Sequence, residues 1–262
     1  MTNNTDQNYK KNVLGFALFL GELMLSNGAE TYRVEDSIIR ICKSRGFNNV
    51  NVFTSPTAII ISDNKFDGFT FMKIIKTRGI NLQKVSLLNT ISRDFVANVD
   101  CDITESMNKL KELDSMSTYH PLTVDISTGL GSAFFACLLG GNNITNFIST
   151  FITSILAITI YKSIMRISSI PAFSSLIASI FIASVGVILS SANILPTPKM
   201  LIVGSIMPLL PGVAFIKGIR DLISGDLISG VSRSFDAGVT AVSIACGVWV
   251  VLDLWYIVGG GF

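Results

Sequence analysis

The sequence predicts an α+β N-terminal domain followed by an all-α bundle of five transmembrane helices. Five long apolar segments lie in the last 140 or so residues, whereas the first 120 contain almost none. Charge is distributed the opposite way, because fourteen of the 20 Lys and Arg residues and thirteen of the 18 Asp and Glu residues precede Tyr119. We therefore expect a cytoplasmic domain over residues 1–118 and a transmembrane domain over residues 119–262.

Helical and extended patterns that are segregated along the chain predict the α+β class of the first domain. Residues 1–8 are polar and are expected to be disordered. The remaining elements are two helices, a meander of three strands and two further helices, over 9–27, 29–45, 49–54, 57–62, 68–76, 81–98 and 102–116. Asp102 and Glu105 are spaced as a capping box for the last of these helices.

The first of these helices has an alternative reading. Lys10 and Lys11 precede the short apolar run Val13–Leu25, as in a signal peptide or membrane anchor. Glu22 interrupts that run, however, and its apolar residues follow helical spacing. This pattern favours an amphipathic helix that packs in a core.

The five apolar segments are each close to the length that crosses a bilayer, because a helix rises about 1.5 Å per residue and needs about 20 apolar residues. They cover residues 122–140, 144–161, 170–192, 200–216 and 237–258. Counted over alternate loops, five Lys and Arg residues fall on one side of the membrane and one on the other. The positive-inside rule then places the N-terminus in the cytoplasm and the C-terminus outside.

The fourth apolar segment contains helix-breaking residues near its middle. Pro208 and Pro211 lack a backbone N–H, and Gly212 follows directly. Freed backbone groups are tolerated in a membrane only where protein or a wet cavity surrounds them, and interrupted helices mark solute sites in many transporters. The alternative is a proline kink that serves packing alone.

Four charged residues near the membrane segments are further candidates for a solute path. Lys217 and Arg220 follow the break, where they either anchor the helix at the interface or form an electropositive vestibule for anionic or zwitterionic solutes. Asp125 and Asp236 lie in or beside the first and fifth segments. An ionisable group within a membrane indicates function, although both aspartates are close to an interface.

No pattern for catalysis or cofactor binding occurs. The chain has no phosphate-binding loop, zinc-protease, nucleophile-elbow or dinucleotide motif, and its only histidine is His120. The four cysteines, without metal-ligand spacing, are expected to be free thiols. We therefore expect no catalytic residues, no metal, no cofactor and no nucleic-acid partner.

Several segments in order resemble the bacterial threonine/serine exporter family. They are Leu25–Glu30, Val34-Glu35, Thr77–Asn81, Pro208–Gly212, Gly225-Asp226 and Gly230. The resemblance extends over about residues 12–258, and the larger subunit of the two-component form is the most similar member type.

The resemblance implies an exporter of small amino acids or of succinate in the cytoplasmic membrane, driven by the proton gradient. It further implies a small, separately encoded membrane subunit as partner, since fused relatives carry a second membrane half. A higher oligomer is compatible with this organisation. The alternative function is a membrane-anchored sensor or regulatory domain without transport, which would have no need of a broken fourth helix.

Overall fold

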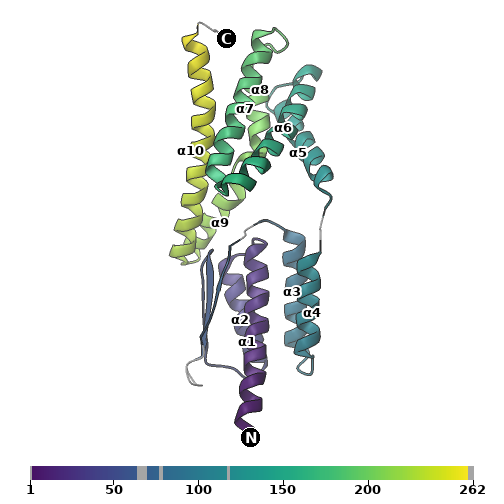
Figure 1. The fold of residues 1–262 in the computed structure, drawn as a ribbon, viewed down its shortest axis with the longest axis vertical. Helices are drawn as coiled ribbons and strands as arrows, with labels where there is room; N and C mark the ends of the chain where they lie inside the picture. Colours follow the sequence, from purple (N-terminus) through teal and green to yellow (C-terminus); the bar gives the residue numbers. More distant parts are fainter. Residues whose placement is uncertain (1, 64–69, 77–78, 117–118, 259–262) are drawn as a thin grey trace. The chain divides into compact units, whose positions relative to one another are not determined.

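A computed structural model describes residues 2–63, 70–76, 79–116 and 119–258, with side chains from Gln7 onward. These residues form two compact units (Figure 1). Unit 1 comprises Met1–Met116 and Ile216–Arg233, and unit 2 comprises Ser117–Phe215 and Ser234–Phe262. Compactness does not establish independent folding, so the domain boundary at residue 118 stays a prediction.

Four helices and a small sheet make up the described residues of the N-terminal part of unit 1, as the sequence predicts. Its elements in chain order are α1 Thr2–Ser26, α2 Thr31–Ser44, β1 Val50–Thr54, β2 Ala58–Asp63, β3 Thr70–Ile74, α3 Leu82–Ala97 and α4 Ile103–Ser115. The strands form an antiparallel meander in the order β1-β2-β3, with Phe53 opposite Ile60 and Ile60 opposite Met72. Residues Ile216–Arg233, from α9 and α10, complete the unit.

Large apolar side chains fill the core of unit 1. Phe16 of α1 stacks on Phe95 of α3 with ring centroids 4.4 Å apart, and Ile59 of β2 is fully buried in the same cluster. The helical spacing of Val13–Leu25 thus places a continuous apolar stripe against α2, α3 and the sheet. The predicted core helix is confirmed.

The ends of unit 1 elements differ from the predictions in two ways. The first helix begins at Thr2, so the prediction of a disordered segment over residues 1–8 is wrong. Asp102 caps α4 by accepting a hydrogen bond from the Thr104 N–H at 3.0 Å, whereas the carboxylate of Glu105 pairs with Lys109 at 2.7 Å. Residues 68–69, the first two of the predicted strand over 68–76, lie outside the described residues.

The regular elements in the described residues of unit 2 are all helical. Its elements are α5 Pro121–Leu138, α6 Ile144–Ser168, α7 Pro171–Ser191, α8 Lys199–Ile206, the 3₁₀ turn η1 Met207–Leu209, and parts of α9 Gly212–Ile223 and α10 Leu227–Ile257. Among the described residues, four helices are long and apolar enough to span a membrane, or five if α8 and α9 form one bent span. The prediction of five spans is therefore supported in part.

Two predicted loops of the membrane region prove to be helical. Residues 162–168 are the last two turns of α6, and most of 217–236 belongs to α9 and α10. α10 begins at Leu227 instead of 237, because the Asp226 carboxylate accepts a hydrogen bond from the Ser229 N–H at 3.2 Å and satisfies the first turn. A hydropathy pattern misses this polar beginning of a helix.

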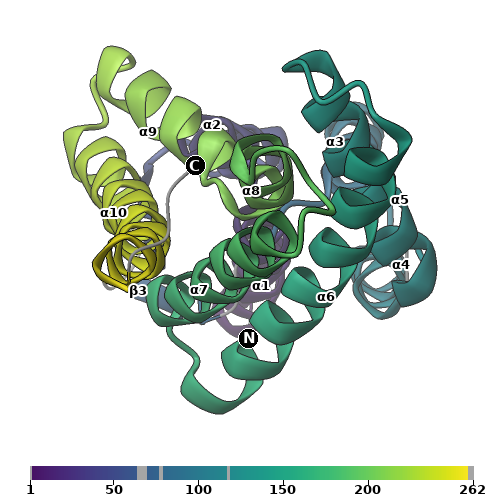
Figure 2. The ribbon, with the colours of Figure 1, turned by 90° about the horizontal axis from the view of Figure 1, so that it is seen from above.

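Small residues set the close packing of unit 2. A Cβ atom at Gly204 of α8 would lie 2.7 Å from the Cβ of Ala136 and 2.9 Å from the carbonyl oxygen of Ser132, both on α5. At Gly247 of α10 it would meet the carbonyl oxygen of Leu176 of α7 at 2.8 Å. α8 packs against α5, α6 and α7 (Figure 2). Close backbone approach of this kind is typical of helices that associate in lipid.

Candidate functional site

The predicted break in the fourth apolar segment is confirmed as a backbone feature. α8 tightens into the 3₁₀ turn that contains Pro208, Leu210 is extended, and α9 starts at Gly212 after a bend of 53°. The Leu210 N–H donates to the Met207 carbonyl at 3.3 Å, and helical bonding resumes where the Phe215 N–H donates to Pro211 at 3.0 Å. Neither proline has an N–H to continue the ladder.

An apolar groove of about 320 Å³ lies beside the break. Its lining residues are Leu210, Pro211, Gly212, Phe215, Ala237, Gly238 and Ala241. Pro211 and Gly212 thus line this groove and Pro208 does not, while the predicted role of all three in a solute path stays a prediction. Asp236 precedes the groove residue Ala237 and is itself exposed on α10. The groove can accommodate hydrocarbon but offers no side-chain charge to a solute.

Asp125 has a cationic neighbour that the sequence did not reveal. Its carboxylate, on α5, pairs with the Lys162 ammonium of α6, and the two side chains are 19% and 42% exposed. Lys162 was expected in a loop, and the extra helical turns of α6 carry it back alongside α5. The pair neutralises the charge of Asp125.

Two turns that carry the family resemblance meet in unit 1. The Gly79 N–H donates to the Ser26 carbonyl at 2.8 Å, and the Asn81 N–H donates to Asn27 at 2.9 Å. Gly28 has φ +88°, and a Cβ at this position would lie 2.8 Å from the Gly79 carbonyl oxygen. Glycine is required there by both backbone conformation and space. Thr77 and Arg78, which belong to the same resemblance, lie outside the described residues.

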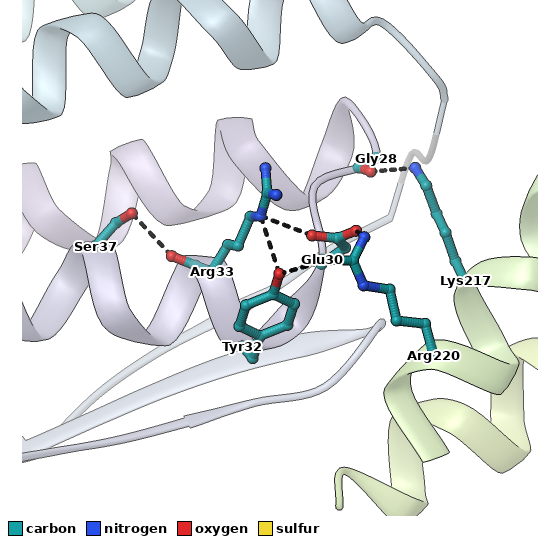
Figure 3. A network of polar contacts seen from close by, with 7 residues as sticks. All are labelled: Gly28, Glu30, Tyr32, Arg33, Ser37, Lys217 and Arg220. Carbon is teal, nitrogen blue, oxygen red and sulfur yellow. Dashed lines mark hydrogen bonds and ion pairs between the residues drawn. The ribbon is translucent and has the colours of Figure 1, made fainter. Parts of the chain in front are cut away.

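The two cations that follow the break bind this junction (Figure 3). The Lys217 ammonium donates to the carbonyl of Gly28, and the Arg220 guanidinium pairs with Glu30. Arg220 also donates to the Tyr32 hydroxyl at 3.1 Å. Both cations are thus engaged by protein acceptors, and their predicted role in a solute vestibule stays a prediction.

Glu30 is the centre of this network because a second guanidinium also reaches it. Arg33 lies 2.7 Å from the Glu30 carboxylate and donates to the Tyr32 hydroxyl at 3.1 Å. The Tyr32 hydroxyl and the Glu30 charge raise the pKa of Arg33 above its ordinary value. Glu30 and Tyr32 were not among the predicted site residues, and only their place within and beside the family segment Leu25–Glu30 marked them.

The turn between α9 and α10 explains the remaining resemblance residues. Gly225 has φ +88°, Asp226 caps α10, and a Cβ at Gly230 would lie 2.7 Å from the Leu222 nitrogen. The nearly fully buried Asp221 carboxylate lies 3.1 Å from the Arg233 guanidinium. These contacts fix a tight helical hairpin. Among the described residues no group of acidic, His and Cys side chains is arranged to bind a metal.

Comparison with known proteins agrees with the resemblance. Residues 15–255 match the family model ThrE, described as "Putative threonine/serine exporter". The chain is 24% identical over 237 residues to the "Probable succinate transporter subunit YjjP" of Klebsiella aerogenes, covering 88% of this chain and 90% of that protein. The Escherichia coli protein of the same name is 23% identical, with 90% and 91% covered.

A longer relative is matched over slightly less than half of its own length. The "Probable threonine/serine exporter" of Mycobacterium tuberculosis is 24% identical over 255 residues, which are 94% of this chain but 47% of that protein. No solved structure matches the chain. The family match extends over nearly all of both units, so this multi-pass membrane protein belongs to the ThrE threonine/serine exporter family.

Proposed function

We propose that the chain is a subunit of a secondary transporter that exports small amino acids such as threonine and serine, or a dicarboxylate such as succinate, driven by the proton gradient. Family membership and the names of the relatives support export. The observation that carries the proposal is the interrupted span α8–η1–α9. A membrane anchor gains nothing from a broken helix, whereas a solute path uses the backbone groups that it frees. This argues against the alternative of a sensor without transport.

A separately encoded small membrane subunit completes the transporter in this proposal. The chain covers nearly the whole of two relatives that are named as subunits, but about half of the Mycobacterium tuberculosis exporter. With five spans, the two ends of the chain lie on opposite sides, so a second half of five spans inserts in inverted orientation. Inverted repeats around a central site are a common transporter plan. The assembly can extend to a higher oligomer.

In the proposed topology, the N-terminus is cytoplasmic and the C-terminus external. The five-to-one distribution of basic residues supports this orientation. Alkaline phosphatase fused after Val258 should be active, and the same enzyme fused after Met116 should not. Activity only after Met116 would reverse the orientation, and inactivity at both positions would mean that α8 and α9 re-enter instead of spanning.

Efflux measurements test the function directly. Cells that lack any relative are loaded with labelled serine, threonine or succinate and express the chain, the partner subunit or both. We expect export of one of these solutes only when both subunits are present, and a proton uncoupler should abolish it. Efflux from the chain alone would remove the partner requirement. The absence of efflux for every solute with both subunits present would overturn the proposed function.

The role of the break is tested by replacing Pro208 and Pro211 together with alanine. The substitution restores two backbone donors and favours a straight helix by up to a few kcal/mol. If the break forms part of the solute path, membrane abundance is unchanged while efflux falls. Reduced abundance together with reduced efflux would indicate packing, and normal efflux at normal abundance would exclude the break from the path.

A further inference from the structure

A row of polar side chains that the candidate site does not include is buried inside unit 2. It comprises Ser132 of α5, Asn146, Thr150 and Ser154 of α6, and Ser205 of α8, and none of them is more than 5% exposed. We call these five residues the hydroxyl seam. Buried polar groups in a membrane bundle are costly unless they are bonded, so their bonding partners decide what they do.

The seam oxygens have no hydrogen-bond partner among the described residues. This holds for the Oγ atoms of Ser132, Ser154 and Ser205, for Oγ1 of Thr150 and for Oδ1 of Asn146. An unbonded buried group of this kind costs about 1–3 kcal/mol. The same state is found in unit 2 for Ser234 Oγ and Trp255 Nε1, so most but not all of this cost in its described residues lies at the seam.

Several other hydroxyls of α5 and α6 are bonded to backbone carbonyls of their own helix. Thr159 of α6 donates to the carbonyl four residues earlier at 2.8 Å, and Thr128 of α5 does the same. Burial is not the cause of the difference, because Ser174 and Ser179 of α7 are fully buried and also donate to backbone carbonyls. The seam side chains thus differ from neighbours of the same type that satisfy themselves locally.

The seam side chains converge where three helices meet. Asn146, Thr150 and Ser154 are four residues apart and form one ridge along α6. At Gly204, a Cβ would lie 3.0 Å from Cγ2 of Thr150 and 2.9 Å from the carbonyl oxygen of Ser132, so the ridge faces both other helices next to Ser205. α8, which carries Ser205, leads directly into the break at Pro208.

The chemistry of the seam selects the kind of solute that it can bind. Hydroxyl groups both donate and accept, and a carboxamide offers two donors and an acceptor. None of the five side chains is charged, so a solute with net charge would remain uncompensated there, which is expensive in a low dielectric. A zwitterion instead finds donors for its carboxylate and acceptors for its ammonium group.

We propose that the hydroxyl seam is a solute-binding site for a small zwitterionic amino acid. This rests on the proposed export function, which leaves amino acid and dicarboxylate open, and it assigns the site to residues that lie wholly within this chain. Opening of α8 against α5 and α6 admits the solute, and the seam oxygens form with it the bonds that they lack in the closed bundle.

Binding to the full chain in lipid nanodiscs tests the proposal. Serine, threonine and succinate are titrated while the thermal unfolding midpoint is followed, because a ligand of the native state raises it. We expect serine or threonine, but not succinate, to raise the midpoint. Thr150→Val keeps the shape of the side chain but removes the hydroxyl, and should raise the half-saturating concentration by about two- to tenfold.

Two further variants separate binding from structure. Thr150→Ser restores the hydroxyl and should bind within about twofold of the wild type. Thr159→Val is the same substitution on the same helix at a hydroxyl that is bonded to the backbone, and should leave binding unchanged. Without ligand, Thr150→Val should unfold at the same temperature as the wild type or higher, since an unbonded buried hydroxyl has been removed.

Several outcomes would overturn the proposal. Equal binding by Thr150→Val and wild type would exclude the seam, as would a wild-type midpoint that none of the solutes moves. Stabilisation by succinate alone would refute the zwitterion. A wild-type chain that binds an amino acid through Thr150 but supports no efflux with its partner would leave the site standing and refute export.

Discussion

The two units of the molecule bury opposite kinds of side chain. Of the twelve largest fully buried side chains among the described residues, eleven lie in unit 1 and one, Ile182, lies in unit 2. Unit 2 instead buries many serines, threonines, alanines and glycines beside a smaller apolar cluster around Ile182 and Leu201, and exposes large residues such as Phe134, Ile167 and Trp249. The kind of side chain that is buried therefore differs between the two units, as expected if they fold in different solvents.

This difference follows from the interactions that stabilise packed helices in each solvent. In water, each Å² of apolar surface that is buried contributes roughly 25 cal/mol to the stability of the fold, so large apolar side chains fill the core. In lipid that gain vanishes between helices, and close backbone approach with dispersion contacts remains. A polar side chain inside unit 2 then has to be explained by bonding or by function, which is how the hydroxyl seam becomes conspicuous.

The largest expected effect is the loss of a core aromatic in unit 1. Phe16→Ala removes the ring that stacks on Phe95 and leaves a cavity, so the free energy of unfolding of unit 1 should fall by about 3–5 kcal/mol. Denaturant unfolding followed by hydrogen exchange in α1 and α3 measures it. Phe235→Ala on α10, where the side chain is 72% exposed, is the matched control. A comparable loss for both variants would mean that a large apolar side chain contributes equally to stability in the two units, which would contradict the comparison.

The next effect tests close packing in unit 2. Gly204→Ala places a methyl group 2.7 Å from Ala136 and 2.9 Å from a backbone oxygen, and overpacking of this kind costs about 1–3 kcal/mol. Gly131→Ala, on α5 with nothing within 4 Å, should stabilise its helix by about 0.5–1 kcal/mol. Thermal unfolding in nanodiscs compares the two. Equal midpoints would show that α8 is not tightly packed.

Sequence reasoning succeeded where a local pattern carries the information. The helical spacing of Val13–Leu25 predicts the core-packed helix α1, and two prolines predict the break after α8. It failed where polar residues are helical, as at Arg220 and Arg233, because hydropathy marks such residues as loop while a cap at Asp226 and a left-handed Gly225 keep both helices intact.

Contacts between residues that are distant in the sequence could not be predicted either. Gly28 and Lys217 are 189 residues apart, and the ion pair of Lys162 with Asp125 joins α6 to α5. Resemblance marked several of the segments that meet at Gly28 without showing that they meet. The seam was missed for a different reason: Thr150 and Thr159 read alike in sequence, and only coordinates reveal which hydroxyl finds a carbonyl.

A smaller effect is expected at the junction of unit 1 turns. Gly28→Ala forces a side chain into a left-handed backbone and against the Gly79 carbonyl, which should destabilise unit 1 by about 1–3 kcal/mol. Gly46→Ala shares the positive φ but meets nothing within 4 Å, so it isolates the conformational part. A difference between the variants in denaturant midpoint measures the steric contact. Identical losses would show that the meeting of the two turns contributes nothing to stability.

The smallest effect concerns the ion pair between Arg220 and Glu30. The Arg220 side chain is 51% exposed, so solvent screens the attraction and the pair should contribute at most about 1 kcal/mol to stability. A double-mutant cycle with Glu30→Gln and Arg220→Gln measures the coupling energy, which should fall further at 1 M salt, where the screening length is about 3 Å. The surface pair Asp36–Arg40 within α2 serves as the control for an ion pair that joins no separate elements.

Export should respond to loss of this ion pair more strongly than stability does. Arg220 and the break residue Gly212 lie on the same helix, so loss of the contact with Glu30 removes one of the contacts that hold α9 in place. Unchanged efflux in Arg220→Gln would mean that the pair is an ordinary surface ion pair without a role in export. A coupling energy well above about 1 kcal/mol would mean that solvent screens the pair less than the exposure of Arg220 indicates.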